Sequence, residues 1–205
     1  MSEKVNRKAI VIIVAVVAVI AIVGGTFAWF VTNSSLSQRL NLSGISVSAD
    51  VYFQTADESK VSADNYKDED GLYKLSLNSG DVNYIGNLRV TVNHSGSKAA
   101  IRVRMNYEWT TADGAVAQYR VKIPYYFNSY WYDNRDNDYC VYYQNKDGSG
   151  KASFDSTELI KRFDSKNFDT AGFSDGISVR ALIEVDAVQP NRYPQLWGIE
   201  KLPWE

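Results

Sequence analysis

The most constraining feature of this 205-residue chain is an alternation of apolar and polar residues that recurs along much of its length. It is clearest in residues 101–109, where every second residue is apolar: Ile101, Val103, Met105, Tyr107 and Trp109. Successive side chains of a strand point to opposite faces, so a period of two indicates a half-buried strand. The same pattern in residues 45–53 and 177–188 predicts two more long strands, each with one face on a core.

Shorter segments with the same pattern or with many β-branched and aromatic residues predict further strands at residues 73–77, 88–92, 119–123 and 139–143. Turn-forming residues separate several of these strands, at residues 78–81, 94–97 and 111–114. Because strands follow one another with almost no helical periodicity, we expect an all-β fold. The specific expectation is an antiparallel two-sheet sandwich, jelly-roll-like, in residues 45–205.

Only one segment of this body has a helical signature. Residues 155–158, with the sequence Asp-Ser-Thr-Glu, have the spacing of a capping box and lead into Leu159, Ile160 and Phe163. We therefore expect one short helix there. Residues 45–205 contain no internal repeat and no linker that would divide them, so one domain is expected.

The N-terminus carries fifteen uninterrupted apolar residues, from Ala9 to Val23, behind three basic residues. The uncharged stretch continues to Val31, enough for about 34 Å of helix, which could span a bilayer core of about 30 Å. Basic residues in front of such a segment hold that end in the cytoplasm. We therefore expect residues 9–31 to enter a membrane and everything after Val31 to lie outside the cell.

A cleavage site follows the apolar run. Thr26 and Ala28 place small side chains at the two positions that a signal peptidase reads, so cleavage before Trp29 is expected. The Gly24-Gly25 pair weakens the helix where the peptidase needs extended chain. Residues 1–28 are then a signal peptide and the mature protein is secreted. If cleavage does not occur, they are a membrane anchor and the protein stays on the cell surface.

The composition excludes several classes of function. A net charge of −2 leaves no cationic excess to neutralise a nucleic-acid backbone, so nucleic acid is not an expected partner. One histidine, His94, and one cysteine, Cys140, are too few for a disulfide, a common zinc site or a Ser-His-Asp triad. We expect His94 in a turn and Cys140 in a strand, both structural. No metalloprotease, phosphate-loop or hydrolase motif is present, so we expect no catalytic, metal or cofactor residues.

Two acidic segments, residues 64–70 and 133–138, could offer oxygen ligands to calcium. Neither has the register of an EF-hand. Counted from Asn134, Tyr139 takes the place of the glycine and Asn145 takes the place of the bidentate glutamate. We favour solvated loops over a calcium site.

Aromatic residues concentrate between residues 125 and 143, where there are more rings than one strand pair can bury on its inner face. One interpretation is an exposed adhesive surface for protein or sugar at Tyr130, Trp131 and Tyr132. The other, which we favour slightly, is cross-strand pairing of the rings within a sheet.

Three parts of the sequence also carry a family resemblance. Residues 24–30, GGTFAWF, form one; an Asn-Ser-Gly-Asp turn, a strand, a small turn and a strand in residues 77–109 form the second. The third is residues 177–198, with Glu-Val-Asp-Ala-Val-Gln and then Trp-Gly. Together they resemble the TasA and camelysin family, bacterial proteins exported through a SipW-type signal peptidase. Residues 119–175 have no counterpart in that pattern.

The resemblance implies a jelly-roll subunit of extracellular biofilm-matrix fibres, a head-to-tail homopolymer in which the freed N-terminal segment adds as a strand to the next copy. Such a strand satisfies unpaired groups at a sheet edge, and a head-to-tail contact that does not close gives a filament. In this chain residues 29–44 would be the flexible donor segment. Its anchoring side chains would be Trp29, Phe30, Val31, Leu36, Leu40 and Leu42.

Two other functions stay open. A membrane-anchored cell-surface adhesin or carbohydrate-binding domain would keep residues 9–31 and bind through the aromatic residues around Trp131. A camelysin-like metallopeptidase is also suggested by the family. One histidine and no zinc signature argue against it, and we expect the chain not to be an enzyme.

Overall fold

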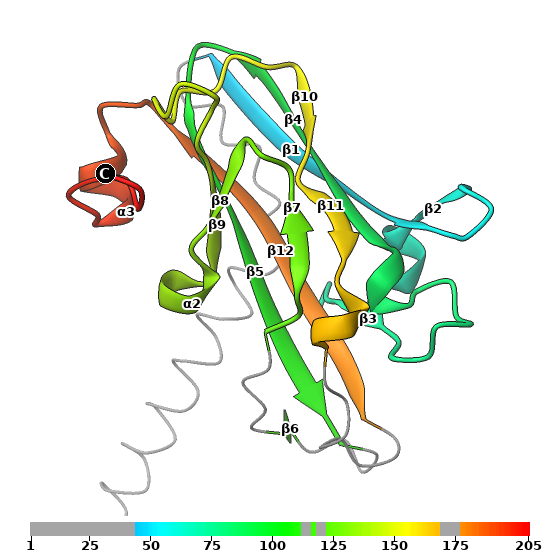
Figure 1. Cartoon of the computed structure of the whole chain (residues 1–205). Coiled ribbons are helices and arrows are strands. Elements are labelled where there is room, and N and C mark those ends of the chain that lie inside the picture. The colour runs from blue at the N-terminus through cyan, green and yellow to red at the C-terminus, as the bar shows by residue number, and fades with distance from the viewer. Residues whose placement is uncertain (1–43, 112–115, 118–121, 169–176) are drawn as a thin grey trace, which may run out of the picture. The chain divides into compact units, whose positions relative to one another are not determined.

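The computed structural model of the chain is shown in Figure 1, and it describes residues 44–111, 116–117, 122–168 and 177–205. The described part is mostly β, with three antiparallel sheets and two short helices. This confirms the all-β class predicted from the alternating pattern. All described residues belong to one of the two compact units into which the chain divides.

The first sheet has four strands in the order β10-β4-β1-β2. β1 (Ile45–Gln54) pairs with β4 (Leu88–Gly96) from Ile45 to Phe53. β2 (Lys60–Ser62) and β10 (Ser156–Glu158) are short strands at its two edges.

The second sheet has six strands in which β5 and β12 form the long central pair. β5 is Ala100–Thr110 and β12 is Ser178–Val188, and they pair over their whole lengths. Its other strands are β3 (Tyr73–Leu75) beside β12, β6 (Val116–Ala117) and β9 (Cys140–Tyr143) beside β5, and β8 (Trp131–Asp133) beside β9.

The third sheet consists of β7 (Tyr125–Phe127) and β11 (Ile160–Phe163). β11 follows β10 directly and contacts β4, while β7 contacts β8. The small sheet therefore lies between one edge of the first sheet and one edge of the second. On that side no long strand edge is left open among the described residues.

Helical segments are short. α2 (Arg135–Asp138) and α3 (Tyr193–Trp197) are single turns of α-helix, and three 3-10 turns accompany them: η1 (Ala63–Tyr66), η2 (Ile85–Asn87) and η3 (Ser165–Asn167). Within the described ranges no helix has the length and apolar character needed to cross a membrane. The apolar run of residues 9–31 lies outside those ranges.

Side chains from all three sheets form one core. The alternating residues of β5 point into it, and the members of the core that are almost completely buried include Phe53, Val90, Ile101, Met105, Trp109 and Ile160. Burying residues of this size contributes roughly 1.5–3 kcal/mol each, so the alternation seen in the sequence accounts for much of the fold's stability.

The structure corrects three sequence-based expectations. The helix predicted from the capping-box spacing at residues 155–158 is wrong, because this segment forms β10 and β11 on either side of Leu159. The Leu159 N–H donates to the Val90 carbonyl, so an edge of β4 supplies the bonding that a helix would have supplied internally. The turn predicted at residues 94–97 is also wrong, since β4 continues to Gly96.

The third correction concerns the number of sheets, and the strand expected at residues 119–123 is described only at its end. Residues 118–121 lie outside the described ranges, and Lys122 and Ile123 belong to no strand. Three sheets are present where two were expected, because residues 125–127 and 160–163 pair with each other.

Candidate functional site

The site most able to bind another chain is an open sheet edge on β1. β1 pairs with β4 along almost its whole length, but on its other side β2 covers only Tyr52 to Gln54. Within the part of the chain that the structure describes, residues 45–51 therefore have a strand neighbour on one side only. An edge of this length presents a row of unpaired N–H and C=O groups.

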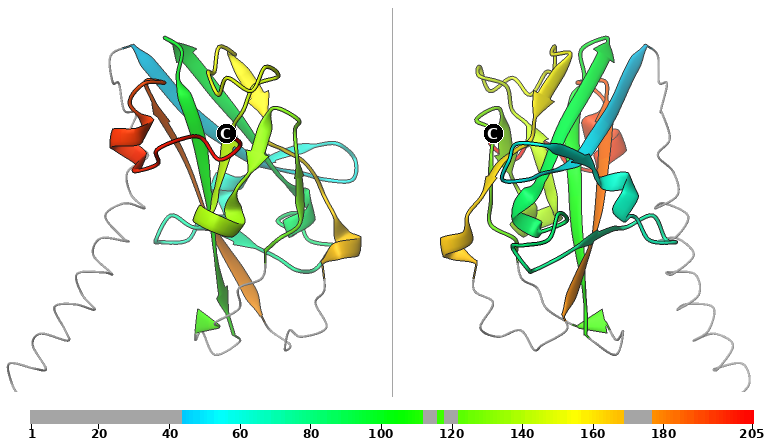
Figure 2. Two further views of the ribbon diagram at one scale, coloured as in Figure 1. Left: turned by 60° about the vertical axis from the view of Figure 1, so that its left-hand side comes forward. Right: turned by 90° about the vertical axis from the view of Figure 1, so that its right-hand side faces the viewer.

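A second open edge lies beside the first. β12 pairs with β5 throughout, while β3 covers only Val179 to Ala181. Residues 182–188 of β12 thus have one strand neighbour among the described residues. β1 contacts β12, and both strands can be followed side by side in the views of Figure 2.

Two hydrogen bonds show which backbone groups point outward at these edges. The Ser97 N–H donates to the Gly44 carbonyl at 2.9 Å, and bonding alternates along an antiparallel pair, so the even-numbered residues of β1 bond to β4. Its odd-numbered residues, such as Val47 and Ala49, direct their N–H and C=O groups to the open side. The Met105 N–H donates to the Tyr139 carbonyl at 2.9 Å, which by the same rule leaves the backbone N–H and C=O groups of Ile183, Val185 and Ala187 in β12 directed outward.

Some of these odd positions carry apolar side chains that are only partly covered, whereas Ile183 and Ala187 are buried. Val47, Ala49 and Val185 pack against the core but stay half-buried. The residues opposite two of them, Val92 opposite Ala49 and Val103 opposite Val185, are completely buried. The core is thus closed on the β4 and β5 side and incomplete on the side where β1 and β12 meet.

The residues predicted to form the cleavage site and the donor segment lie outside the described ranges. These are Thr26, Ala28 and Trp29 for cleavage, and Trp29, Phe30, Val31, Leu36, Leu40 and Leu42 for the donor. The described structure begins at Gly44, next to the open edge of β1.

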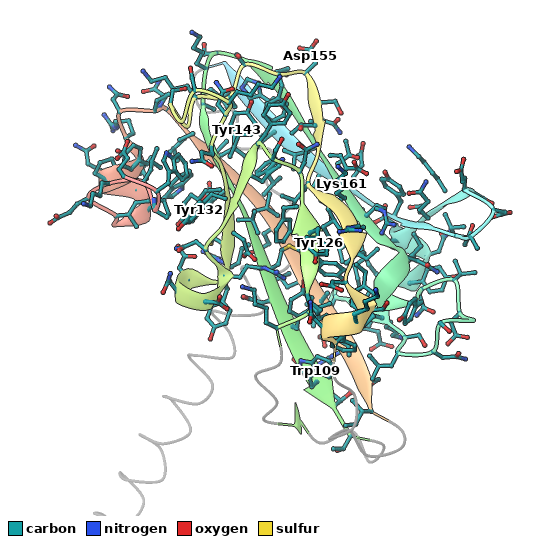
Figure 3. All side chains as sticks on the ribbon, viewed as in Figure 1. Trp109, Tyr126, Tyr132, Tyr143, Asp155 and Lys161 are labelled. Carbon is teal, nitrogen blue, oxygen red and sulfur yellow. The ribbon has the colours of Figure 1, made fainter. Side chains whose placement is uncertain are left out.

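Trp131, the centre of the predicted aromatic surface, is a core residue with 6% of its surface exposed. It pairs in register with Tyr143, and their rings meet edge to face with centroids 5.4 Å apart. Tyr132 is half-buried against Trp204 at 5.7 Å, and the ammonium of Lys146 lies 5.4 Å from the ring of Tyr130. Trp131 therefore belongs to no exposed aromatic face. Its neighbour Tyr132 and its partner Tyr143 are labelled in Figure 3. Among the described residues the most exposed rings are Tyr126 and Tyr139, at 43% and 59%.

The outer face of the six-stranded sheet is occupied by charge pairs and by the C-terminal segment. Arg102 is directly opposite Asp186 and Arg104 is opposite Glu184, and both pairs form salt bridges. Trp197 of α3 donates its indole N–H to Asp186 at 2.7 Å, and the guanidinium of Arg102 lies 4.6 Å from the indole ring. These contacts hold the C-terminal segment on the sheet.

His94 and Cys140 are both buried. The expected turn position of His94 is wrong, because it lies in β4; its ring nitrogens are each 3.0 Å from a backbone carbonyl oxygen, of Phe154 and of Ser97. Cys140 begins β9, as expected of a strand residue, and burial together with the nearby Asp138 carboxylate raises the pKa of its thiol. A buried thiol of raised pKa is a poor nucleophile.

The acidic segments are largely engaged by cations. Asp133 holds the buried Arg135 through bonds of 2.9 and 3.0 Å, and Lys122 contacts Asp136. Asp68 and Asp70 both contact Arg180. Among the described residues no group of three or more His, Cys, Asp or Glu side chains is arranged to hold a metal ion.

Sequence reasoning did not find the open edges of β1 and β12. The alternating pattern shows which face of a strand is buried, but it does not show which neighbours bond to its backbone. The only available signal was the shortness of the two segments, residues 60–62 and 73–75, that cover each edge in part.

Comparisons with known proteins add no relative: the chain matches no family model, no curated protein and no solved structure.

Proposed function

We propose that this chain is a secreted structural subunit that assembles with copies of itself into extracellular fibres. In this proposal residues 1–28 are a leader removed by a SipW-type signal peptidase. The domain from residue 45 is a jelly-roll-like sandwich, and each mature copy donates its N-terminal segment to the next. The biofilm-matrix setting comes only from the resemblance to the TasA and camelysin family.

The observation that carries the proposal is the open edge at residues 45–51 of β1, beside the second open edge on β12. Outward-directed N–H and C=O groups can bond to an added strand. Half-buried Val47, Ala49 and Val185 can gain contacts from its side chains at the same time. Both contributions favour an extended apolar strand over a globular ligand.

The proposed donor has the pattern that this edge requires. Leucines occupy positions 36, 40 and 42, with Gln38 among them at the fourth even-numbered position, while the residues at 35, 37, 39, 41 and 43 are polar. One face of an extended segment therefore carries three leucines and one glutamine, and the other face is polar throughout. Trp29, Phe30 and Val31 add three bulky apolar residues at the end that cleavage would free.

The proposal can be tested with the mature chain, residues 29–205. The leucines at 36, 40 and 42 are replaced together by serine, and assembly is followed by electron microscopy and by sedimentation. We expect wild-type protein to form fibres and the triple variant to stay soluble and folded, because its donor segment no longer has an apolar face.

The matched control changes the opposite face of the same segment. Replacing Ser35, Ser37 and Asn41 by alanine keeps the apolar face and should leave fibre formation intact. Fibres from the leucine variant that are as abundant as those of wild type would refute the donor role. Loss of fibres in both variants would show that the segment acts without the predicted alternation.

Export and processing need a separate measurement. The intact mass of the protein purified from its native host should correspond to a chain that begins near Trp29. A mass that includes Met1 would instead favour a membrane-anchored cell-surface domain.

A further inference from the structure

The open edge of β1 is symmetric about its middle residue, Ser48. Gly44 lies in a turn with φ of +80°, so the strand begins at Ile45. Among the described residues the edge is free from there to Val51, and β2 takes over at Tyr52. The residues whose backbone groups point outward are the odd-numbered ones, spaced evenly on the two sides of Ser48.

This symmetry fits the edge to a second copy of itself. A two-fold axis at Ser48 makes the two β1 strands antiparallel, with Ile45 opposite Val51 of the second copy and Val47 opposite Ala49. Every outward-directed residue then meets another outward-directed residue, so their N–H and C=O groups can bond to each other. Any other position of the axis leaves part of the edge without an opposite residue of the same edge.

The core-side residues of the edge gain from this contact. Val47 and Ala49 pack against the core but are only half-buried, because no described strand lies beyond them. Directly opposed residues of an antiparallel pair lie on the same face, with Cβ atoms about 4.5–5.5 Å apart. Val47 of each copy therefore covers Ala49 of the other, and the incomplete sides of the two cores meet.

The outer face of the edge brings no like charges together. In this register Asp50 lies opposite Ser46 of the second copy, and Ser48 lies opposite itself. Asp50, the only charged residue between positions 45 and 51, also accepts a hydrogen bond of 2.7 Å from Asn93 of its own chain. Its carboxylate therefore meets a hydroxyl across the axis, and not another carboxylate.

The neighbouring open edge of β12 lacks this self-complementarity. Its free part, residues 182–188, is centred on Val185. A two-fold axis there places Glu184 opposite Asp186 of the second copy, and two carboxylates directly opposite each other destabilise a strand pair. Their arginine partners lie on β5, one strand further from the edge. Of the two edges, β1 is therefore the one that a second copy can cover.

From the length, the symmetry and the charges of this edge we propose that two copies of the chain pair through β1, with a two-fold axis at Ser48. Such a contact closes on itself and does not extend. It occupies the edge that the donor segment needs, so the dimer holds back fibre assembly until it dissociates. This regulatory consequence rests on the proposed function, whereas the dimer does not.

A single cysteine tests the register in the mature chain, residues 29–205. Residue 48 faces itself in a non-hydrogen-bonded pair, with Cα atoms expected about 4.5 Å apart, within the range of a disulfide. Ser48 is exposed, so Ser48→Cys should give a disulfide-linked dimer under mild oxidation, measured by mass spectrometry and on non-reducing gels. The native Cys140 is buried and can stay.

The matched control is Ser46→Cys, because Ser46 faces Asp50 of the second copy and not itself. Alone, it should cross-link at least about tenfold more slowly than Ser48→Cys, since its two sulfur atoms are not held together. Mixed with Asp50→Cys, it should give mixed dimers at a rate comparable to that of Ser48→Cys. Equal rates for Ser46→Cys alone and Ser48→Cys would overturn the proposed register.

A charge on the axis tests the dimer without a cross-link. Ser48→Asp brings two carboxylates opposite each other, so it should sediment as a monomer at concentrations where wild type sediments as a dimer. Ser95→Asp is the control, since Ser95 is exposed on the same outer face but lies on β4, opposite Ser46. It adds the same charge away from the axis and should stay dimeric. Wild type that is monomeric at every concentration would overturn the dimer.

Fibre formation separates the dimer from the proposed function. The oxidised Ser48→Cys dimer should form no fibres until a reductant is added, and fibres made from it without reduction would contradict the regulatory role. Wild-type fibres together with no 48–48 cross-link at any stage would refute the dimer and leave strand donation standing. A cross-linked dimer that never forms fibres after reduction would refute the proposed function and leave the dimer standing.

Discussion

Gly96 lies so close to Gly44 that a Cβ on Gly96 would be 1.7 Å from the Gly44 carbonyl oxygen. Gly96 ends β4 with φ of +93°, and the neighbouring Ser97 N–H bonds to that same carbonyl. The corner where the chain enters β1 is therefore built from two glycines, one required by conformation and the other by both conformation and space.

We expect Gly96→Ala to lower the free energy of unfolding by roughly 2–4 kcal/mol, the sum of a backbone collision and an unfavourable positive φ. Denaturant unfolding monitored by tryptophan fluorescence would measure it. Gly148→Ala, which meets no neighbour, should cost only about 1 kcal/mol. Similar losses in the two variants would show that the Gly44 and Gly96 backbones do not approach this closely.

Ala49→Pro tests the open edge of β1 directly. The N–H of Ala49 points away from β4, so a proline there removes a bond to an added strand while sparing the pairing with β4. We expect a folded protein, measured by circular dichroism, that does not sediment as fibres.

Ser48→Pro is the control for that experiment, because its N–H bonds to β4. It should lower the free energy of unfolding by roughly 2–4 kcal/mol, whereas Ala49→Pro should cost clearly less. If Ala49→Pro is the more destabilising of the two, the assignment of outward-directed groups on β1 is reversed.

The sequence predicted the strands whose pattern is set by burial, and it missed what depends on neighbours. Residues 45–53, 101–109 and 177–188 alternate because one face of each is packed, and all three are strands. Residues 155–163 favoured a helix locally, but the Val90 carbonyl accepts from Leu159 and selects a strand. Local propensity gives way where an edge offers bonds.

Two further features show the same difference between what a local pattern predicts and what depends on neighbouring strands. α3 had a readable signal, with Pro194 in its first turn and Gly198 in the left-handed conformation after it, which is a common helix boundary pattern. No signal in the sequence marked the partial exposure of Val185. Val185 and the completely buried Val103 opposite it are identical residues in similar alternating strands. Only the position of β12 at an open edge separates them.

Tyr107→Phe should stabilise the protein at high pH. Burial raises the pKa of Tyr107 to about 12 from an ordinary value of 10.0, with Arg135 opposing the shift in part. A raised tyrosine pKa means that the folded state holds the proton more tightly. Its contribution to stability is complete below pH 10 and is lost as the pH rises from about 10 toward 12.

The phenylalanine variant removes this loss, and near neutral pH it also removes a buried hydroxyl that has no hydrogen-bond partner among the described residues. We expect a gain of up to about 1 kcal/mol at pH 7 and a larger gain at pH 11, measured by urea unfolding. Tyr139→Phe, at an exposed ring, should change neither value. Equal pH dependence in wild type and Tyr107→Phe would show that Tyr107 ionises without unfolding the protein.

Trp197→Ala should release the C-terminal segment without unfolding the sheets. The indole N–H bonds to Asp186, the ring lies against Arg102, and its edge packs on Tyr142, so alanine removes three contacts that hold α3 on the outer face. The salt bridge of Arg102 with Asp186 stays in place beneath it. Because Arg192 and Lys201 are exposed in the released segment, trypsin should cut there several-fold faster than in wild type, while the thermal transition of the main core changes little.

Leu196→Ala is the matched control, since Leu196 lies in the same helical turn but is 54% exposed and should leave the cleavage rate unchanged. Equal rates in the two variants would mean that the segment is held by Leu202 and Trp204, not by the contact of Trp197 with Asp186 and Arg102.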